Sequence, residues 1–217
     1  MIEDLLPIGH PVGVMGSNER GAVELYQIRR GREIISVYPA HWNLWVLMRG
    51  HRPTPSRIAP VDVDGLARAY LELDDHDRRS RPGDAGPLLN RADVGSAIDD
   101  LRAAGLAYRL DRGSTASMTE FAGRHRLVAF MSGLGNLRAA PDTFALGYPG
   151  GEPVFVSRLG MHLWTRAHEV RGLGEEIDTL REQSASADGD PQLEAGNLML
   201  DEARALLAVG AAVLDVV

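Results

Sequence analysis

The chain repeats a pattern of apolar residues in its two halves, and this repeat limits the possible folds more than any other feature. Residues 33–45 and 152–164 match at a constant spacing, with Trp45 and Trp164 lying 119 positions apart. The other matched pairs are Ile35 with Val154, Val37 with Val156, and Leu44 with Leu163. Self-similarity at a fixed spacing is typical of a repeated structural unit. We therefore expect two units with the same order of strands and helices.

A second matching block follows each copy, at residues 93–110 and 198–214. Between the blocks, both halves carry a polar segment rich in helix-breaking residues, at 74–92 and 182–197. Insertions at the same point of each half support the alignment. The sequence therefore predicts a first unit over residues 1–121 and a second over residues 122–217, each of ordinary domain size.

The charge of the chain disfavours nucleic acid as a partner. The sequence has 30 acidic and 23 basic residues, a formal net charge of −7, and no lysine, so every basic residue is arginine. Affinity for nucleic acid comes mainly from clustered basic side chains that neutralise phosphates. Nucleic acid is thus a disfavoured but not excluded partner, and a peptide or protein partner fits the composition better.

Cysteine is absent, so the chain has no disulfides, no thiolate nucleophile and no cysteine-based metal site. The first residues are acidic where a secretory signal would be basic, and no apolar run approaches the roughly 18 residues that a membrane span requires. We expect a cytoplasmic protein without a membrane partner.

The first half predicts strands followed by helices. Alternating apolar residues indicate strands at 23–28 and 34–38 joined by a turn, with a further strand at 12–15. Pro39 is suited to the first turn of a helix that Gly50 can end. The remaining expected elements are helices at about 63–73 and 92–104, the latter closed by Gly105, and a strand at 106–110.

The second half predicts the same order. Strands are expected at 127–131, 144–146 and 154–156, and Ser157 is a suitable N-cap for the helix that carries Trp164. Two further apolar stripes indicate helices at about 173–180 and 200–207, the last ended by Gly210 and followed by a strand at 212–214. The predicted order of each half is β-β-β-α-α-α-β.

This order predicts an α+β fold of two tandem winged helix-turn-helix-like units, each a small antiparallel sheet plus three helices. Residues 42–50, 64–71 and 97–106 resemble the PqqD-like family, small winged-helix domains that recognise ribosomally made, modified precursor peptides. The likeness extends over most of both halves. The doubling departs from the single domain usual in that family.

The resemblance implies that a leader peptide adds as an extra strand to the sheet edge and lies in a groove against the third helix. An exposed strand edge offers unpaired N–H and C=O groups, and alternate side chains fill apolar pockets. In the first unit the matching positions are Ile34, Ser36 and Tyr38 on the strand with Val94, Ile98 and Leu101 on the helix. In the second unit they are Val154, Val156 and Ser157 with Leu200, Ala203 and Leu206. The simpler interpretation of each apolar residue is a place in the core.

No group of residues in the sequence matches a known catalytic arrangement. His76 lies among Asp74, Asp75 and Asp77, but neighbouring arginines and a Pro-Gly pair indicate a solvated loop rather than a metal site. Residues 132–136 lack the pattern of a phosphate loop and predict a turn. Ser114, Thr115 and Ser117 have no evident base and are interpreted as linker residues. The sequence therefore predicts no catalytic residue, no metal and no cofactor, and favours a binding protein over an enzyme.

Two other functions stay open. A winged-helix regulator would insert its third helix into the DNA major groove, but residues 93–104 carry three acidic residues and one arginine. A structural adaptor or homodimer would instead pair apolar sheet edges with another chain. The grooves of both units could bind peptide, or one groove could be closed as an interface within the chain. The apolar last strand of the second unit favours the first unit as the open one.

Overall fold

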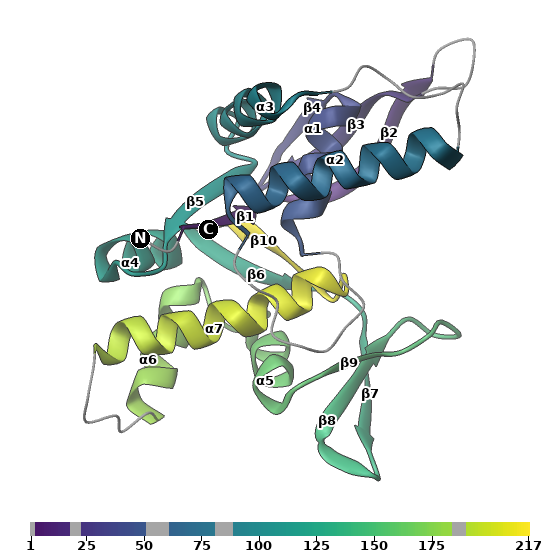
Figure 1. Ribbon diagram of the computed structural model, residues 1–217. Helices are drawn as coiled ribbons and strands as arrows, with labels where there is room; N and C mark the ends of the chain where they lie inside the picture. The colour runs from purple at the N-terminus through teal and green to yellow at the C-terminus, as the bar shows by residue number, and fades with distance from the viewer. Residues whose placement is uncertain (1–2, 18–22, 51–60, 81–88, 184–189) are drawn as a thin grey trace. The chain divides into compact units, whose positions relative to one another are not determined.

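The computed structural model describes residues 3–17, 23–50, 61–80, 89–183 and 190–217 of the chain. The fold is mixed α+β, with helices and small sheets (Figure 1). The chain divides into two compact units, an N-terminal unit of residues 3–49 and 60–109 and a C-terminal unit of residues 110–217. The predicted boundary after residue 121 falls inside a helix. Among the described residues, no helix combines the length and the apolarity needed to cross a membrane.

The N-terminal unit contains four strands, three helices and a closing strand. They are β1 (Glu3–Pro7), β2 (His10–Ser17), β3 (Val23–Arg30), β4 (Glu33–Val37), α1 (Pro39–Met48), α2 (Val63–Ser80), α3 (Arg91–Ala103) and β5 (Ala107–Asp111). Strand β1 pairs with β5, and β2, β3 and β4 form a separate three-stranded antiparallel sheet. The hairpin predicted from the alternating residues is the β3–β4 hairpin, with Ile28 opposite Ile35.

The C-terminal unit has the same order after one additional helix. Its elements are α4 (Thr115–Arg124), β6 (His125–Ala129), β7 (Ser132–Leu137), β8 (Ala140–Gly147), β9 (Val154–Val156), α5 (Arg158–Arg166), α6 (Leu173–Gln183), α7 (Pro191–Ala208) and β10 (Ala212–Val216). Strand β6 pairs with β10, and β7, β8 and β9 form a three-stranded antiparallel sheet. Each half therefore repeats the strand pairing of the other.

Three sequence predictions are wrong in their details. Each unit has four strands before its helices rather than three, because β1 was not predicted and residues 132–136 form strand β7 instead of a turn. The serines and threonine interpreted as a linker belong to α4, where Ser114 is the N-cap and its side chain accepts a hydrogen bond from the N–H of Ser117. Helix α2 continues through residue 80, so residues 74–80 are helical and not a loop. The side chains of His76 and its acidic neighbours lie outside the described residues.

The predicted helix ends are confirmed. Pro39 occupies the first turn of α1, and Ser157 caps α5 by accepting a hydrogen bond from the N–H of Gly160 at 2.9 Å. Gly105 and Gly210 follow the third helix of each unit with φ of 67° and 73°. A left-handed residue at this place reverses the chain and satisfies the last helical carbonyl groups.

One tertiary contact is the same in both units and joins the first helix to the end of the first strand. The indole N–H of Trp45 donates to the carbonyl of Ile8 at 3.0 Å, and that of Trp164 donates to the carbonyl of Phe130 at 2.6 Å. The next residue is left-handed in each case, Gly9 with φ of 95° and Met131 with φ of 68°. The two tryptophans matched in the sequence are therefore matched in their contacts.

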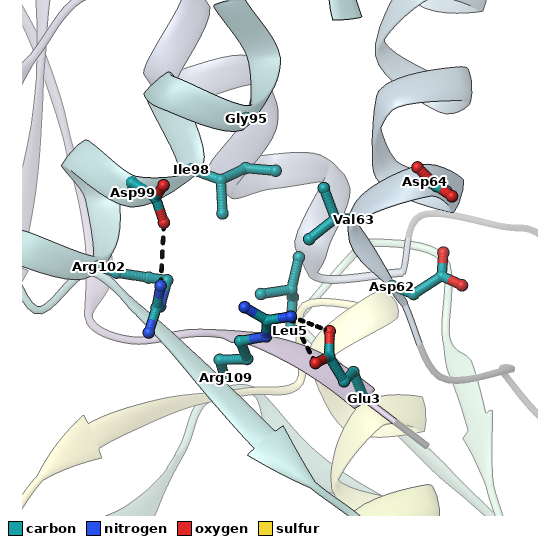
Figure 2. Close-up of a pocket in the computed structure, with 10 residues that line it drawn as sticks. All are labelled: Glu3, Leu5, Asp62, Val63, Asp64, Gly95, Ile98, Asp99, Arg102 and Arg109. Carbon is teal, nitrogen blue, oxygen red and sulfur yellow. Dashed lines mark hydrogen bonds and ion pairs between the residues drawn. The ribbon is translucent and has the colours of Figure 1, made fainter. Parts of the chain in front are cut away.

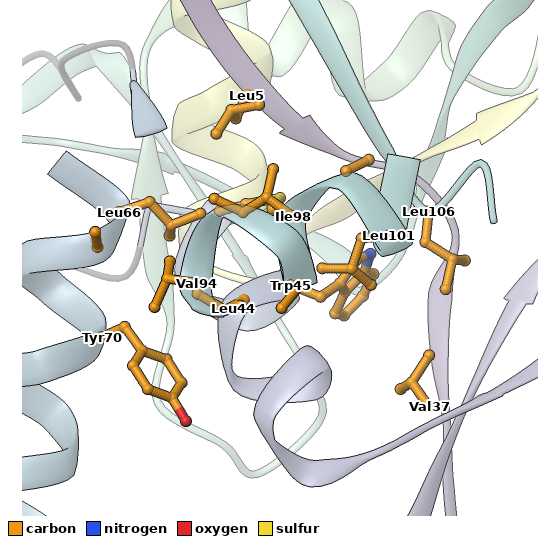
Figure 3. Close-up of a cluster of buried hydrophobic side chains, with 14 of the residues drawn as sticks. Leu5, Val37, Leu44, Trp45, Leu66, Tyr70, Val94, Ile98, Leu101 and Leu106 are labelled. Carbon is orange, nitrogen blue, oxygen red and sulfur yellow. The ribbon is translucent and has the colours of Figure 1, made fainter. Parts of the chain in front are cut away.

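The core of the N-terminal unit lies where the helices meet the inner faces of the strands (Figure 3). Trp45 and Leu44 of α1 pack with Leu66 and Tyr70 of α2 in this cluster. Helix α3 contributes Val94, Ile98 and Leu101, which are at most 2% exposed. Strand β4 contributes Val37, while Ile35 is partly buried against the same cluster.

Candidate functional site

Strand β4 forms an open edge of its sheet in the described part of the chain, where it pairs with β3 alone. Its side chains alternate, so Ile35 and Val37 face the core while Ile34 and Ser36 face outward. Ile34 is 58% exposed, and Tyr38, directly after the strand, is 66% exposed. The strand half of the predicted site is therefore exposed.

Two sets of contacts connect the C-terminal end of α3 with residues on either side of β4. At the start of β4, Arg30 donates to the carbonyl of Ala104 at 2.8 Å and to Glu33 at 2.5 Å. At its other end, His41 Nε2 and Asp100 Oδ2 lie 3.3 Å apart, and the His41 ring lies 6.2 Å from the ring of Tyr38. The last turn of α3 and the residue after it thus contact residues just before and just after the open strand.

The helix residues predicted for the site lie elsewhere. Val94, Ile98 and Leu101 belong to the core cluster, so they support the helix from beneath and do not line an open surface next to Ile34. The groups that contact the residues flanking β4 are instead the carboxylate of Asp100 and the carbonyl of Ala104, the residue after α3. Ile98 has a second environment, because it also borders the cavity described below.

The corresponding strand of the C-terminal unit is shorter. Strand β9 has three residues, of which Val154 is partly buried and Val156 is buried, while Phe155 between them is 51% exposed. Ser157 donates from its hydroxyl to Glu202 of α7 at 2.7 Å. The three helix positions predicted for this unit, Leu200, Ala203 and Leu206, are buried in the core.

A cavity of about 410 Å³ opens in the N-terminal unit between β1, β5, the start of α2 and α3 (Figure 2). Its apolar wall consists of Leu5, Val63 and Ile98, with Gly95 on the adjacent turn of α3. This cavity was not predicted from the sequence, because its residues come from four separate segments. The one signal that could have pointed to it is Gly95 inside a helical pattern, because a glycine there lowers helix stability and often has a packing or functional reason.

Six charged side chains complete the cavity. Arg109 pairs with Glu3, and Arg102 donates to Asp99 at 2.9 Å. Asp62 accepts from the N–H of Gly65 at 2.6 Å at the start of α2. The full charged set is Glu3, Asp62, Asp64, Asp99, Arg102 and Arg109. Four carboxylates against two guanidinium groups leave the rim acidic.

A buried ionic cluster in the C-terminal unit was also missed from the sequence. Glu176 is 2% exposed and accepts a hydrogen bond from Nε of Arg166 at 2.6 Å. That hydrogen bond and the negative charge of Glu176 raise the pKa of Arg166 above its ordinary value. His162 Nε2 lies 3.3 Å from the second carboxylate oxygen. Because Arg166 and His162 are on α5 and Glu176 is on α6, the cluster joins these two helices.

In the described ranges, no three His, Asp or Glu side chains are grouped so that they could hold a metal ion. Comparison with known proteins gave no match, since no protein-family model matches the chain and no curated protein or solved structure is significantly similar to it. The interpretation of the site therefore depends on its geometry and charge.

Proposed function

We propose that the chain is a noncatalytic peptide- or protein-binding adaptor built from two winged-helix-like units, and that its N-terminal unit binds an extended peptide along β4. The resemblance noted in the sequence suggests a precursor (leader) peptide as the ligand. The observation that carries the proposal is the open edge of β4, flanked by exposed Ile34 and Tyr38.

Addition of a strand would use this edge directly. A peptide laid along β4 would hydrogen-bond its main chain to the outer N–H and C=O groups of the strand. Apolar peptide side chains would contact Ile34 on the outer face of the sheet. On the helix side, the exposed Asp100 would offer a carboxylate to its basic groups.

The C-terminal unit offers a weaker site of the same kind. Strand β9 provides three residues where β4 provides five, so fewer main-chain hydrogen bonds can form. Phe155 gives it one exposed apolar anchor. We expect the first unit to supply most of the affinity and the second to add to it only for a ligand long enough to reach both.

DNA binding receives less support. The exposed face of α3 carries Asp99 and Asp100, which would repel phosphates. Arg102 on the same helix is paired with Asp99, and Arg30 is engaged by Glu33 and by the carbonyl of Ala104.

Fluorescence anisotropy tests the proposal. The full chain is titrated against labelled short peptides encoded beside its own gene, and in parallel against DNA from its upstream region, at low and moderate salt. We expect saturable peptide binding that survives salt and falls roughly tenfold or more in Ile34→Asp, as loss of an interface anchor typically costs.

The matched control is Val14→Asp. Val14 lies on β2, at the opposite edge of the same sheet, and is 56% exposed, close to the value for Ile34. Equal losses in the two variants would contradict binding along β4. Tight binding to DNA that weakens steeply with salt would replace the proposal with a DNA-binding function.

A further inference from the structure

The two units differ most at the cavity of the N-terminal unit. The glycines after the third helices, Gly105 and Gly210, align α3 with α7, and on this alignment Gly95 corresponds to Leu200. Aligned in the same way, Asp99 corresponds to Arg204, Arg102 to Leu207 and Arg109 to Leu214. All four residues of the C-terminal unit are at most 1% exposed. The face of the third helix that is open in one unit is buried in the other.

The additional helix α4 covers this region in the C-terminal unit. It packs against α6, α7 and β6, which correspond to the elements α2, α3 and β1 that border the cavity. Met118, Phe121 and Ala122 form its buried face, at positions i, i+3 and i+4.

The fit of α4 is close. A Cβ placed on Gly196 of α7 would lie 2.6 Å from Cγ of Met118, so α4 approaches α7 where that helix has no side chain. Arg112, just before α4, donates to the side chain of Asn197 at 2.9 Å and to Asp201 at 2.7 Å. This part of the repeat is thus built to hold an amphipathic helix.

In the N-terminal unit the corresponding surface is the cavity with its acidic rim. A Cβ placed on Gly95 would have no atom within 4 Å. We propose that this cavity is the docking site for an amphipathic helix of a partner protein, with apolar residues at i, i+3 and i+4 and basic residues beside them. The apolar spacing is that of α4, and the basic residues complement the four carboxylates of the rim.

The test uses a covalently stapled helical peptide with Met, Phe and Ala at i, i+3 and i+4 and arginines on its flanks. It is titrated into isotope-labelled full chain, and amide and methyl shifts are followed by NMR. We expect saturable shifts at Gly95, Ile98 and Leu5 and affinity at least about fivefold weaker for the same peptide with glutamates in place of arginines.

Gly95→Leu supplies the residue that the C-terminal unit has at this place. It should reduce affinity for the stapled peptide at least about tenfold while leaving binding along β4 unchanged. Gly123→Leu is the matched control, since Gly123 is also a helical glycine whose Cβ would meet nothing within 4 Å. Asp99→Asn, which removes one rim carboxylate without filling the cavity, should weaken binding by about threefold at low salt.

Absence of saturable shifts at the cavity, or equal loss of affinity in Gly95→Leu and Gly123→Leu, would overturn the proposal. Shifts at Gly95 and Ile98 that grow with protein concentration alone would also overturn it, because the occupant would then be a second copy of this chain. The β4 variants are measured separately, so failure of either site is seen independently of the other.

Discussion

The N-terminal and C-terminal units share one order of strands and helices but present different surfaces. The third helix of the first unit exposes Asp99 and Arg102 beside an open cavity, whereas the same face of α7 is buried in a unit that also contains α4. The pairing of strands is identical in the two. A few side chains and one helix therefore decide whether this framework is open or covered.

The residues that follow the edge strands β4 and β9 also differ, and again the C-terminal unit is the more closed of the two. Tyr38 makes no side-chain capping hydrogen bond and stays exposed, while Ser157 caps α5 and also bonds to Glu202. Gly160, which corresponds to His41, lets α5 approach α7, since a Cβ there would lie 3.1 Å from Glu202. The second unit is more tightly joined at the place where the first leaves its strand accessible.

The largest expected effect tests how far the shared tryptophan contact supports both units. Trp45→Ala should lower the free energy of unfolding by about 3–5 kcal/mol, because a large side chain is lost from a closed core. Trp164→Ala should cost about 1–2 kcal/mol less, since Trp164 is only partly buried and removes less apolar surface from water. Denaturant unfolding followed by circular dichroism measures both.

The phenylalanine variants Trp45→Phe and Trp164→Phe are the control. Each keeps an aromatic ring and leaves one buried carbonyl without its indole donor, at a cost of about 1–3 kcal/mol. Similar losses in the two variants would indicate that the contact has the same role in both units. A loss of stability in only one of the two variants would show that the contact has different roles in the two units.

An intermediate effect is expected at the left-handed residue after each bonded carbonyl. Gly9→Ala should destabilise the chain by about 2 kcal/mol or more, because the new Cβ would lie 2.6 Å from the carbonyl oxygen of Arg29 and φ is 95°. Met131→Gly should be stabilising by up to about 1 kcal/mol, since Met131 holds a left-handed conformation at φ of 68° with a side chain. Thermal unfolding of both variants checks that one substitution lowers stability and the other raises it. A stabilising Gly9→Ala would contradict a left-handed conformation at Gly9.

The smallest effect concerns pH. His125 corresponds to the partly buried Glu3 but is 5% exposed in its own unit, with Nδ1 2.8 Å from the carbonyl of Phe121. Burial lowers the pKa of His125, reinforced by Arg124 and opposed by that carbonyl and by Asp215. The unfolded chain therefore takes up a proton near pH 6.5 that the folded chain does not. Stability should fall as the pH drops through this value.

His125→Gln isolates this contribution. The variant should lose stability at neutral pH through poorer packing, but its free energy of unfolding should change less between about pH 7.5 and pH 5.5 than that of the parent chain. Denaturant titrations at both pH values give the comparison. An unchanged difference would assign the pH dependence to other groups.

Local patterns in the sequence predicted much of this fold. The matched tryptophans, the proline and serine at helix starts and the glycines at helix ends each act through neighbouring residues, so their signals are readable in one segment. Strand β1 was missed because Glu3–Pro7 has no alternation and is specified by its pairing with β5. Helix α4 was missed because its serines suggested a linker, although Met118, Phe121 and Ala122 have helical spacing.

The candidate sites were less predictable. Ile34 on the edge strand and Tyr38 directly after it are exposed, whereas Val94 and Leu101, expected to line the same groove, lie in the core. From a helical stripe alone, an apolar residue under a groove cannot be told from one lining it. The cavity depends on residues such as Glu3 and Arg109 that meet only when the first and last strands pair.

The pairing of the first strand with the last strand of each unit also sets the order in which the protein can fold during synthesis. The chain emerges from the ribosome N-terminus first, and β1 must wait for β5 before its sheet can form. The three-stranded sheet and α1 can assemble earlier from local contacts, while closure of β1 on β5 carries the loop entropy of the whole unit. We expect the N-terminal unit to become resistant to protease only after Asp111 has left the exit tunnel, and the C-terminal unit only after β10 has followed.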